Sequence, residues 1–415
     1  MTLRLAFGLL LVCATALLWL PAVEKLLARS SAQRWLGWAF ISSRLLGWLA
    51  CYVAVPGLVR YSDLMLYYTP EASKVVAGLV PYRDFPTSYG PVYPYLNAAA
   101  LLVWPHPAAI ALVAVLFEIA ALRLFVRLGS GDGDIAMTRT AFVYLLNPAA
   151  LYWSGMLGYN SPVVLLFWVL ALAALLARRP LASAAALAAS IVAGKFLGVL
   201  LAPVWLLAAR RRPGAVAGVA GAGLAGLLLA GQMGLDLTLP LQREGDRSTS
   251  GNLWFLASVL PGVDPGSALW RVGPALAFAT AAAAMVTTTA RRWAAAGPTL
   301  AQACGAIAAL GWLFMLLSKK SFPHYTPMFL LFAVYAMSAW APRAGRWPVL
   351  LAILGAIGII EPGLWNALKQ PSSLGLACSG ACAPLVLADI ALAALTLAML
   401  RPALGAAWTP AVDPP

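Results

Sequence analysis

Residues 61–94 bring acidic and aromatic side chains together at a spacing that could support group transfer. The stretch begins "YSDLMLYY", directly after a long apolar run, and continues into "PYRDFPTSYGPVYP". A carboxylate at the wall of a dry cavity can act as a general base, an effect of about 10²–10⁴ in rate. Asp63 is the first candidate for this role and Asp84 the second, with a solvated loop charge as the alternative. Hydroxyls and flat faces that suit sugar binding come from Tyr67, Tyr82 and Tyr89.

A group of cations lies late in the chain, in "SKKSFPHY". Lys319, Lys320 and His324 could hold a phosphate, because cationic side chains form charge-assisted hydrogen bonds to phosphate oxygens. The alternative is that the two lysines snorkel toward lipid headgroups. Upstream of them, "SGNLWFL" offers Asn252 and Trp254 as sugar or headgroup contacts.

The composition decides which class of protein must position these residues. Of 415 residues, 62% are hydrophobic and 10% are charged, whereas a soluble domain carries about a quarter charged residues. Apolar runs long enough to cross about 30 Å of hydrocarbon recur along the chain. The net charge of +14 comes largely from short arginine clusters between those runs, which is the positive-inside pattern and not a nucleic-acid surface. We therefore predict a multi-pass membrane protein without a nucleic-acid partner.

The predicted fold is an all-α bundle of about 11–13 membrane helices in one integral domain, residues 1–415. The candidate spans are residues 3–20, 36–58, 107–126, 139–156, 161–177, 213–233, 269–290, 297–317, 325–341, 347–361 and 384–400. The first of them could also be an uncleaved signal sequence. Two external loops follow from this layout, a long first loop at 59–91 and a second at 234–268. Inside the first loop, "PEASKVVAGLVPY" predicts a short helix with proline in its first turn.

Residues 181–209 require a different arrangement. Arginine clusters flank both ends, so both ends should be cytoplasmic. A helix of this length reaches about 43 Å, whereas two full crossings need about 60 Å. We predict a short re-entrant-type helix pair that turns back near "AGKFLG". Lys195 at that depth needs a polar cavity or a lipid headgroup, or else it snorkels from a shallower hairpin.

Two acidic residues fall inside predicted spans, where an unpaired charge is costly. We expect Glu118 to pair with Arg123 on the same helix. For Asp389 in the last span we expect polar packing between helices. Neither residue is a candidate for catalysis on this reading.

The segment "RYSDLMLYYTPEASKVVAGLVPYRDFPTSYGPVYPYL" resembles the first external loop of GT-C glycosyltransferases, membrane enzymes that use polyprenyl-phosphate sugars. It is similar in particular to the polyprenyl-phosphate-mannose-dependent mannosyltransferases. In that group an aspartate soon after a span precedes a "G-x-x-PY" step and an aromatic "Y-x-P" start of a helix. The matching positions here are Asp63, Gly78, Pro81, Tyr82, Tyr89 and Pro91.

Later segments resemble the same family in the same order. "WSGMLGYNSPVV" is similar to its "G-x-x-D" turn, with Asn160, a candidate sugar or acceptor contact, where an acidic residue is common. "AGKFLGVLL" is similar to its lysine-centred helix pair. "SGNLWFL" and "SKKSFPHYTPMFLLF" resemble its external asparagine-aromatic segment and its late "K…H-x-Y" segment. Several relatives carry an Asp-x-Asp pair, whose second position is Met65 here. Because hard cations need several oxygen ligands, this departure favours a general base and no required cofactor, and it leaves a divalent metal open.

The resemblance implies a GT-C-like fold and transfer of a hexose, in the first place mannose, from polyprenyl phosphate to a lipid-linked or cell-envelope acceptor. Asp63 would deprotonate the acceptor hydroxyl, and cations would hold the leaving phosphate, so that the anomeric configuration inverts. The site would face outward from the plasma membrane. One alternative is a transporter or flippase, which would place broken spans symmetrically in two halves. The other is a polysaccharide polymerase or ligase of a different membrane fold.

Overall fold

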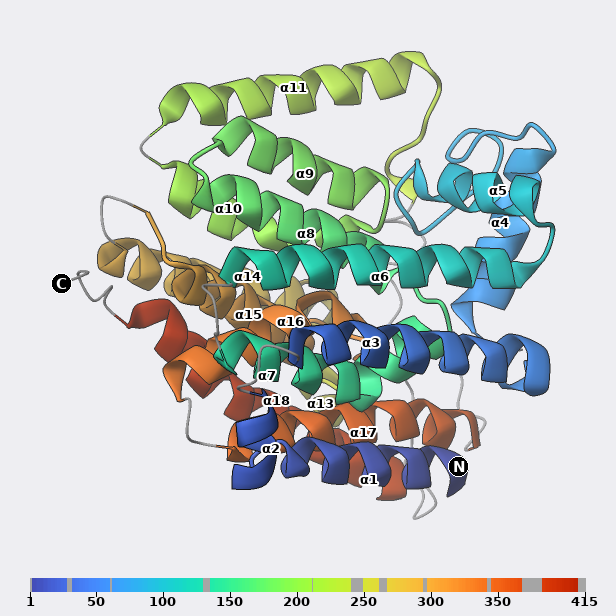
Figure 1. The fold of residues 1–415 in the computed structure, drawn as a ribbon. Coiled ribbons are helices and arrows are strands. Elements are labelled where there is room, and N and C mark those ends of the chain that lie inside the picture. Colours follow the sequence, from blue (N-terminus) through green and yellow to red (C-terminus); the bar gives the residue numbers. More distant parts are fainter. Residues whose placement is uncertain are drawn as a thin grey trace. The chain divides into compact units, whose positions relative to one another are not determined.

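The protein is an all-α, multi-pass membrane protein (Figure 1). The computed structural model describes residues 2–27, 32–59, 62–129, 135–210, 212–239, 249–260, 267–293, 297–341, 345–367 and 383–409. These ranges contain no β-strand, and one isolated bridge within them pairs Pro81 with Phe85. Seven of the described helices are long and apolar enough to cross a membrane.

The candidate spans among the described residues are Arg34–Ala54, Pro107–Gly129, Pro213–Gln232, Ala268–Arg292, Leu300–Leu317, Arg346–Leu364 and Ala383–Trp408. An eighth arises if η4 (Ala150–Met156) and α8 (Ser161–Leu176), which meet at a bend of 106°, form one broken span. Shorter apolar helices cover Arg4–Leu17, Tyr93–Val103, Pro180–Val192, Phe196–Ala209 and Pro327–Trp340. The expected bundle of about 11–13 membrane helices depends on whether these shorter helices also enter the membrane, so that number stays a prediction.

Proline explains why one predicted span is interrupted. The sequence predicts a continuous span over 139–156, but α7 (Ile135–Leu146) ends before Asn147 and a separate π-helical segment, η4, follows. Pro148 has no backbone N–H and disfavours helical geometry at the residue before it. The helix therefore stops at this Asn-Pro step, although mainly apolar residues continue on both sides of it.

The chain forms two compact units, which we describe separately. The first unit comprises Met1–Trp38, Gly129–Tyr152 and Asp246–Pro415, and the second comprises Ala39–Leu128 and Trp153–Gly245. The helices of the first unit are α1 (Thr2–Leu17), α2 (Pro21–Leu27), α7, α13 (Leu253–Ser258), α14 (Ala268–Arg292), α15 (Leu300–Leu317), η6 (Pro323–Tyr325), α16 (Pro327–Trp340), α17 (Arg346–Ala367) and α18 (Ala383–Trp408).

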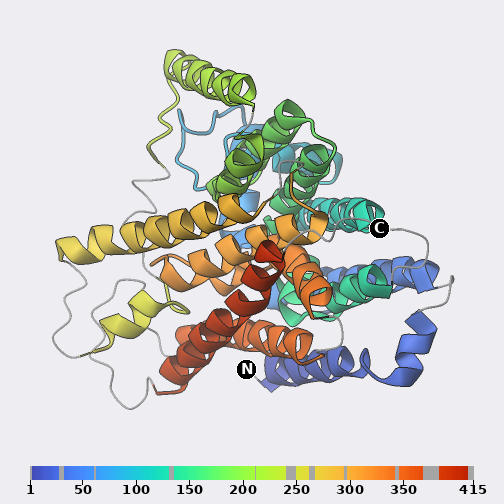
Figure 2. The same ribbon diagram turned by 90° about the vertical axis from the view of Figure 1, so that its left-hand side faces the viewer.

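Small residues allow close helix packing in the first unit. Helix α15 packs against α16 and α18, and α17 packs against α1 and α18; the orange and red helices run together in Figure 2. A Cβ added to Gly305 would lie 2.5 Å from the backbone nitrogen of Ala407, and one added to Gly8 would lie 2.9 Å from Cβ of Ala356. Because lipid is as apolar as the side chains, such backbone proximity is a main source of association between membrane helices.

The second unit holds the long predicted external loop and the short-helix pair. Its elements are most of α3 (Ala32–Leu49), η1 (Ala50–Ala54), η2 (Pro56–Val59), η3 (Leu64–Tyr68), α4 (Thr69–Val76), α5 (Tyr93–Val103), α6 (Pro107–Gly129), α8, α9 (Pro180–Val192), η5 (Phe196–Leu201), α10 (Ala202–Ala209) and α11 (Pro213–Gln232). Residues 181–209 thus fold as two short helical pieces that meet at Lys195. Their re-entrant placement in a membrane stays a prediction.

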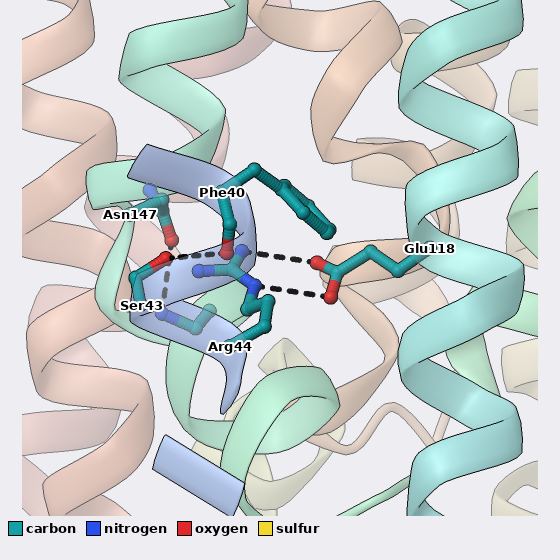
Figure 3. A network of polar contacts seen from close by, with 6 residues as sticks. Phe40, Ser43, Arg44, Glu118 and Asn147 are labelled. Carbon is teal, nitrogen blue, oxygen red and sulfur yellow. Dashed lines mark hydrogen bonds and ion pairs between the residues drawn. The ribbon is translucent and has the colours of Figure 1, made fainter. Parts of the chain in front are cut away.

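A buried ion pair joins α3 to α6 in the second unit (Figure 3). Nε and Nη2 of Arg44 each donate a hydrogen bond of 3.0 Å to the carboxylate of Glu118, and both side chains are fully buried. The guanidinium also lies 5.1 Å from the centre of the Phe40 ring. The expectation that Glu118 pairs with Arg123 is therefore wrong. Residues five apart point about 140° away from each other around a helix, and the side chain of Arg123 is exposed.

Replacing Glu118 with alanine should lower the free energy of unfolding by about 3–5 kcal/mol, because it leaves a buried guanidinium without its counter-charge. The double variant Arg44→Met/Glu118→Leu should recover most of that loss. Equilibrium unfolding of the purified protein in detergent measures both. Arg123→Ala is the matched control and should change stability by less than about 0.5 kcal/mol. Equal effects of Glu118→Ala and Arg123→Ala would contradict the assignment.

Candidate functional site

Asp63 stands at the start of a helix in the second unit. It immediately precedes η3, which continues directly into α4. The short helix predicted from "PEASKVV" is confirmed, with Pro70 in the first turn of α4, and it is extended backward by η3. The Asp63 side chain is half-buried and makes no capping hydrogen bond. Its Oδ2 accepts a hydrogen bond of 3.3 Å from the hydroxyl of Tyr89.

Buried tyrosine rings surround this carboxylate. Tyr68 meets Tyr89 edge to face, with ring centres 4.9 Å apart, and meets Tyr93 in the same way at 5.1 Å. Tyr159 lies against Tyr68 at 6.5 Å. We call Tyr68, Tyr89, Tyr93 and Tyr159 the tyrosine cluster. Burial, followed by the negative charge of Asp63, holds the pKa of Tyr89 well above its usual range, so this hydroxyl stays protonated and remains a donor.

Lys195 joins the cluster from the break between α9 and η5. Its ammonium nitrogen lies 5.3 Å from the centre of the Tyr89 ring, a cation–π distance. Burial lowers the pKa of Lys195 to about 8, and the charge of Asp63 acts in the opposite direction. A basic and an acidic side chain therefore lie on the same tyrosine. The sequence marked Lys195 as an intramembrane lysine in need of a polar neighbour, but it did not assign the residue to the site.

Backbone contacts explain why Lys195 lies here. The amide of Gly90 donates to the carbonyl of Gly194 at 3.2 Å, and the amide of Val92 donates to the carbonyl of Val192 at 2.8 Å. A Cβ at position 90 would lie 2.1 Å from the carbonyl oxygen of Ile191. Only glycine allows so close an approach. The 90–92 segment, which begins one residue after Tyr89, is thus fixed on the last turn of α9 and on Gly194. Gly194 is the residue before Lys195.

Asn160 bridges the cluster to the same turn. Its amide N–H donates to the hydroxyl of Tyr68 at 3.3 Å, and its side-chain nitrogen donates to the carbonyl of Gly194 at 3.5 Å. The side chain is buried, with 2% exposure. Predicted as a sugar or acceptor contact, Asn160 has contacts here that position other residues of the site.

Further hydrogen bonds hold the backbone of Tyr89 in place. Its amide donates to Oγ1 of Thr87 at 3.2 Å, and that hydroxyl donates to Oε2 of Glu71 at 2.7 Å. The Tyr82 hydroxyl donates to the carbonyl of Tyr89. Tyr82 has a φ of +67°, a left-handed conformation that costs a non-glycine residue about 1–3 kcal/mol. The sequence does not assign Glu71 or Thr87 to the site. The one signal it offers is that Glu71 is a carboxylate within the predicted first external loop.

The other two candidates of this loop lie apart from the tyrosine cluster. Asp84 is on an exposed turn, where its carboxylate accepts from Arg83 at 3.0 Å and from the amide of Val80 at 2.7 Å. Its ion pair with Arg83 and this amide hold the pKa of Asp84 below its usual range. Tyr67 is half-buried on η3, and no contact to the cluster is found for it among the described residues. The geometry favours Asp63 over Asp84.

The predicted phosphate-binding residues belong to the first unit. Lys319 and Lys320 are half-buried in the turn between α15 and α16. His324 follows in η6, stacks on Phe322 at 4.8 Å and meets Tyr325 edge to face at 4.5 Å. The carbonyl of Lys319 accepts a hydrogen bond of 2.9 Å from the amide of Thr249. Because these residues and Asp63 lie in different units, a cavity shared by them stays a prediction.

Asn252 and Trp254 have structural contacts in the same unit. The Asn252 side chain is fully buried and caps α13 by accepting from the amide of Phe255 at 2.9 Å. Nε1 of Trp254 donates to the carbonyl of Leu317 at 2.7 Å, and its ring meets Trp270 edge to face. Neither contact requires a ligand. Residues 240–248 and 261–266 of the predicted second external loop lie outside the described residues.

Two helices of the first unit each carry a buried acid. The hydroxyl of Ser250 donates to the carboxylate of Glu361 on α17. Asp389 on α18 is fully buried, and its carboxylate has no hydrogen-bond partner within the described part of the chain. Its Oδ1 would lie 3.9 Å from a Cβ built on Gly251. Two buried acidic groups thus lie on α17 and α18, and the polar packing expected for Asp389 stays a prediction.

Comparison with family models, with curated proteins and with solved structures finds no match to this chain. In the described ranges, no group of three or more histidine, cysteine, aspartate or glutamate side chains is placed to hold a metal ion. We therefore infer a function from the geometry of Asp63, the tyrosine cluster and Lys195.

Gly90→Ala should lower the free energy of unfolding by about 1–3 kcal/mol, because the added methyl group overlaps the carbonyl of Ile191 and the two segments, which two hydrogen bonds join, must move apart. Thermal unfolding of the purified protein in detergent measures the effect. Gly57→Ala is the matched control in the same unit, because a Cβ there meets no atom within 4 Å. Equal melting temperatures for the two variants would show that the 90–92 contact does not hold the site together.

Proposed function

We propose that the protein is a membrane glycosyltransferase that moves a hexose, in the first place mannose, from a polyprenyl-phosphate donor to a lipid-linked or cell-envelope acceptor. The proposal rests on the contacts of one residue, Tyr89. Its hydroxyl donates to Asp63, and the ammonium of Lys195 lies over its ring. This arrangement supports a proton acceptor and a phosphate-binding cation in one place. The order of motifs along the sequence supports the donor class.

The proposed step forms one bond and breaks one bond. Asp63 accepts the proton of the acceptor hydroxyl while that oxygen attacks the anomeric carbon. The bond from this carbon to the phosphate oxygen breaks, and its electron pair leaves with the polyprenyl phosphate. Attack opposite to the leaving group inverts the anomeric configuration. The reaction needs no cofactor in this form, and a divalent ion could add to the charge stabilisation of the phosphate.

Lys195 has the chemistry for the leaving phosphate. An ammonium with a pKa of about 8 is mostly charged at neutral pH, and a cation in a poorly solvated place stabilises developing charge more strongly than one in water. The part of Lys319, Lys320 and His324 in binding the donor phosphate stays a prediction. The tyrosine faces, with Tyr89 and Tyr82 the predicted sugar contacts, suit a hexose ring. The proposed location is the external face of the plasma membrane.

Asp63→Asn should reduce sugar transfer by about 10²–10⁴-fold, because asparagine keeps the shape and the contact with Tyr89 but cannot take a proton. The assay uses purified protein in nanodiscs with a panel of radiolabelled polyprenyl-phosphate hexoses and membrane-extracted lipid acceptors. Asp84→Asn is the control, since Asp84 pairs with Arg83 on an exposed turn, and it should retain most activity. Retention of most activity in Asp63→Asn would remove Asp63 from the reaction. Substrate uptake into sealed vesicles without a glycosylated product would favour the transporter.

Transfer should slow as the pH rises through about 8, where Lys195 loses its proton. Lys195→Arg should keep part of the activity and lose this alkaline limb, because a guanidinium stays charged, and Lys195→Gln should be slow at every pH. Stability should respond in the opposite direction. In the unfolded chain the pKa of Lys195 is about 10.5, so between about pH 8 and 10.5 the unfolded state binds more protons than the folded state. The contribution of Lys195 to the free energy of unfolding therefore rises as the pH increases from about 8 to 10.5. An unchanged alkaline limb in Lys195→Arg would contradict the assignment.

A further inference from the structure

A basic groove lies at the other end of the short-helix pair in the second unit, where the turn before α9 meets the turn before α11. Its volume is about 400 Å³, within the range of about 300–1,000 Å³ for small-molecule sites. The lining residues are Arg179, Pro180, Leu181, Ala182, Arg212, Gly214 and Ala215. Both arginines are exposed, and none of the lining residues is acidic.

The same local sequence builds both sides of the groove. Each of the two helices begins with an Arg-Pro step, so that proline occupies the first turn, where its missing N–H costs nothing. Helix α8 ends at Leu176, and Arg178, two residues later, has a φ of +58° and reverses the chain. Nη1 of Arg212 then donates to the carbonyl of Arg178 at 2.5 Å. This bond ties the two turns together and sets the width of the groove.

The groove is electropositive for two separate reasons. Arg179 and Arg212 contribute two formal charges. In addition, the first turns of α9 and α11 line it through Leu181, Ala182 and Gly214, and N–H groups of a first helical turn have no partner within the helix. Each helix N-terminus carries about half a positive charge. Guanidinium groups and helix N-termini are both suited to phosphate oxygens.

An apolar wall continues from this charged end. No part of the most apolar stretch of α11 is buried, and Leu181, which is 60% exposed, lies against Gly218 of α11. Figure 1 shows α11 running beside α9 in light green. Ala230 is the one buried residue of α11, so this candidate span presents most of its surface to lipid chains. If the phosphate of a lipid is bound at the start of α11, the acyl chains of that lipid would thus lie next to the helix.

We propose that this groove binds the phosphodiester headgroup of an anionic glycerophospholipid, with the acyl chains along α11. The arginines contact the phosphate oxygens, and the free N–H groups of the two helix starts complete the site. The positive-inside pattern assigns this end of α9 and α11 to the cytoplasmic side. The lipid site is independent of the proposed transferase activity.

The test uses the full-length protein in a neutral detergent, titrated with short-chain phosphatidylglycerol and, separately, with short-chain phosphatidylcholine and inorganic phosphate. Bound lipid is counted by native mass spectrometry, and the shift in melting temperature gives the apparent affinity. Phosphatidylglycerol should bind and stabilise. Phosphatidylcholine should bind more weakly, because its choline cation is repelled by the two arginines, and inorganic phosphate should not stabilise. Stabilisation by inorganic phosphate at the same concentration would overturn the lipid assignment, since it would identify a plain anion site.

Arg179→Gln is the decisive variant, because Arg212 also holds the two turns together. Loss of one charge-assisted contact should weaken phosphatidylglycerol binding by about tenfold, with an unchanged melting temperature in the absence of lipid. Arg401→Gln removes another exposed arginine, on α18, and should bind the lipid as the unaltered protein does. Equal phosphatidylglycerol affinities for Arg179→Gln and Arg401→Gln would overturn the proposal.

Discussion

The close approach of Gly90 to the last turn of α9 is the constraint on which the candidate site depends. It leaves no room for a side chain, since a Cβ at position 90 would lie 2.1 Å from a carbonyl oxygen. Two backbone hydrogen bonds then fix the loop that carries Tyr89 to the break that carries Lys195. Tyr89 and Lys195, more than a hundred positions apart in the sequence, are thereby held close together by backbone contacts. Their proximity does not depend on side-chain conformations. A site built on backbone contacts is more exactly placed than one built on flexible side chains.

The two charged arrangements in the second unit differ in kind. Arg44 and Glu118 form a bidentate ion pair that is fully buried. The two charges neutralise each other, and the pair joins α3 to α6. Asp63 instead keeps partial exposure and accepts from a tyrosine hydroxyl that cannot ionise near neutral pH. The Lys195 pKa is lowered mainly by burial. A basic group whose pKa is lowered and that lies near a carboxylate is typical of functional sites.

Sequence reasoning succeeded where local chemistry decides the structure. Composition predicted the all-α membrane protein, and a proline followed by a good helix-forming run predicted α4. Charge at both ends of 181–209 predicted two short helices with Lys195 near the break, and the chain does break there. Each of these conclusions uses information within a few turns of the residue concerned.

Long-range partners could not be predicted in the same way. Glu118 was paired with the arginine nearest in sequence, but its partner is on another helix, because packing and not sequence distance selects the neighbour. The hydrogen bond from Thr87 to Glu71 and the left-handed backbone of Tyr82 depend equally on the folded loop. Asn252 and Trp254 carry residue types that suit ligands, yet their contacts cap and anchor helix α13.

We propose that Asp63, Tyr89 and Lys195 form one binding site for a sugar phosphate. A cryo-EM reconstruction of the protein in nanodiscs with a non-transferable polyprenyl-phosphonate analogue of the donor would test this. We expect phosphonate density within about 3 Å of the Lys195 ammonium, with the sugar ring against the tyrosine cluster and beside Asp63. Well-resolved analogue bound elsewhere on the protein, with this cluster vacant, would contradict it.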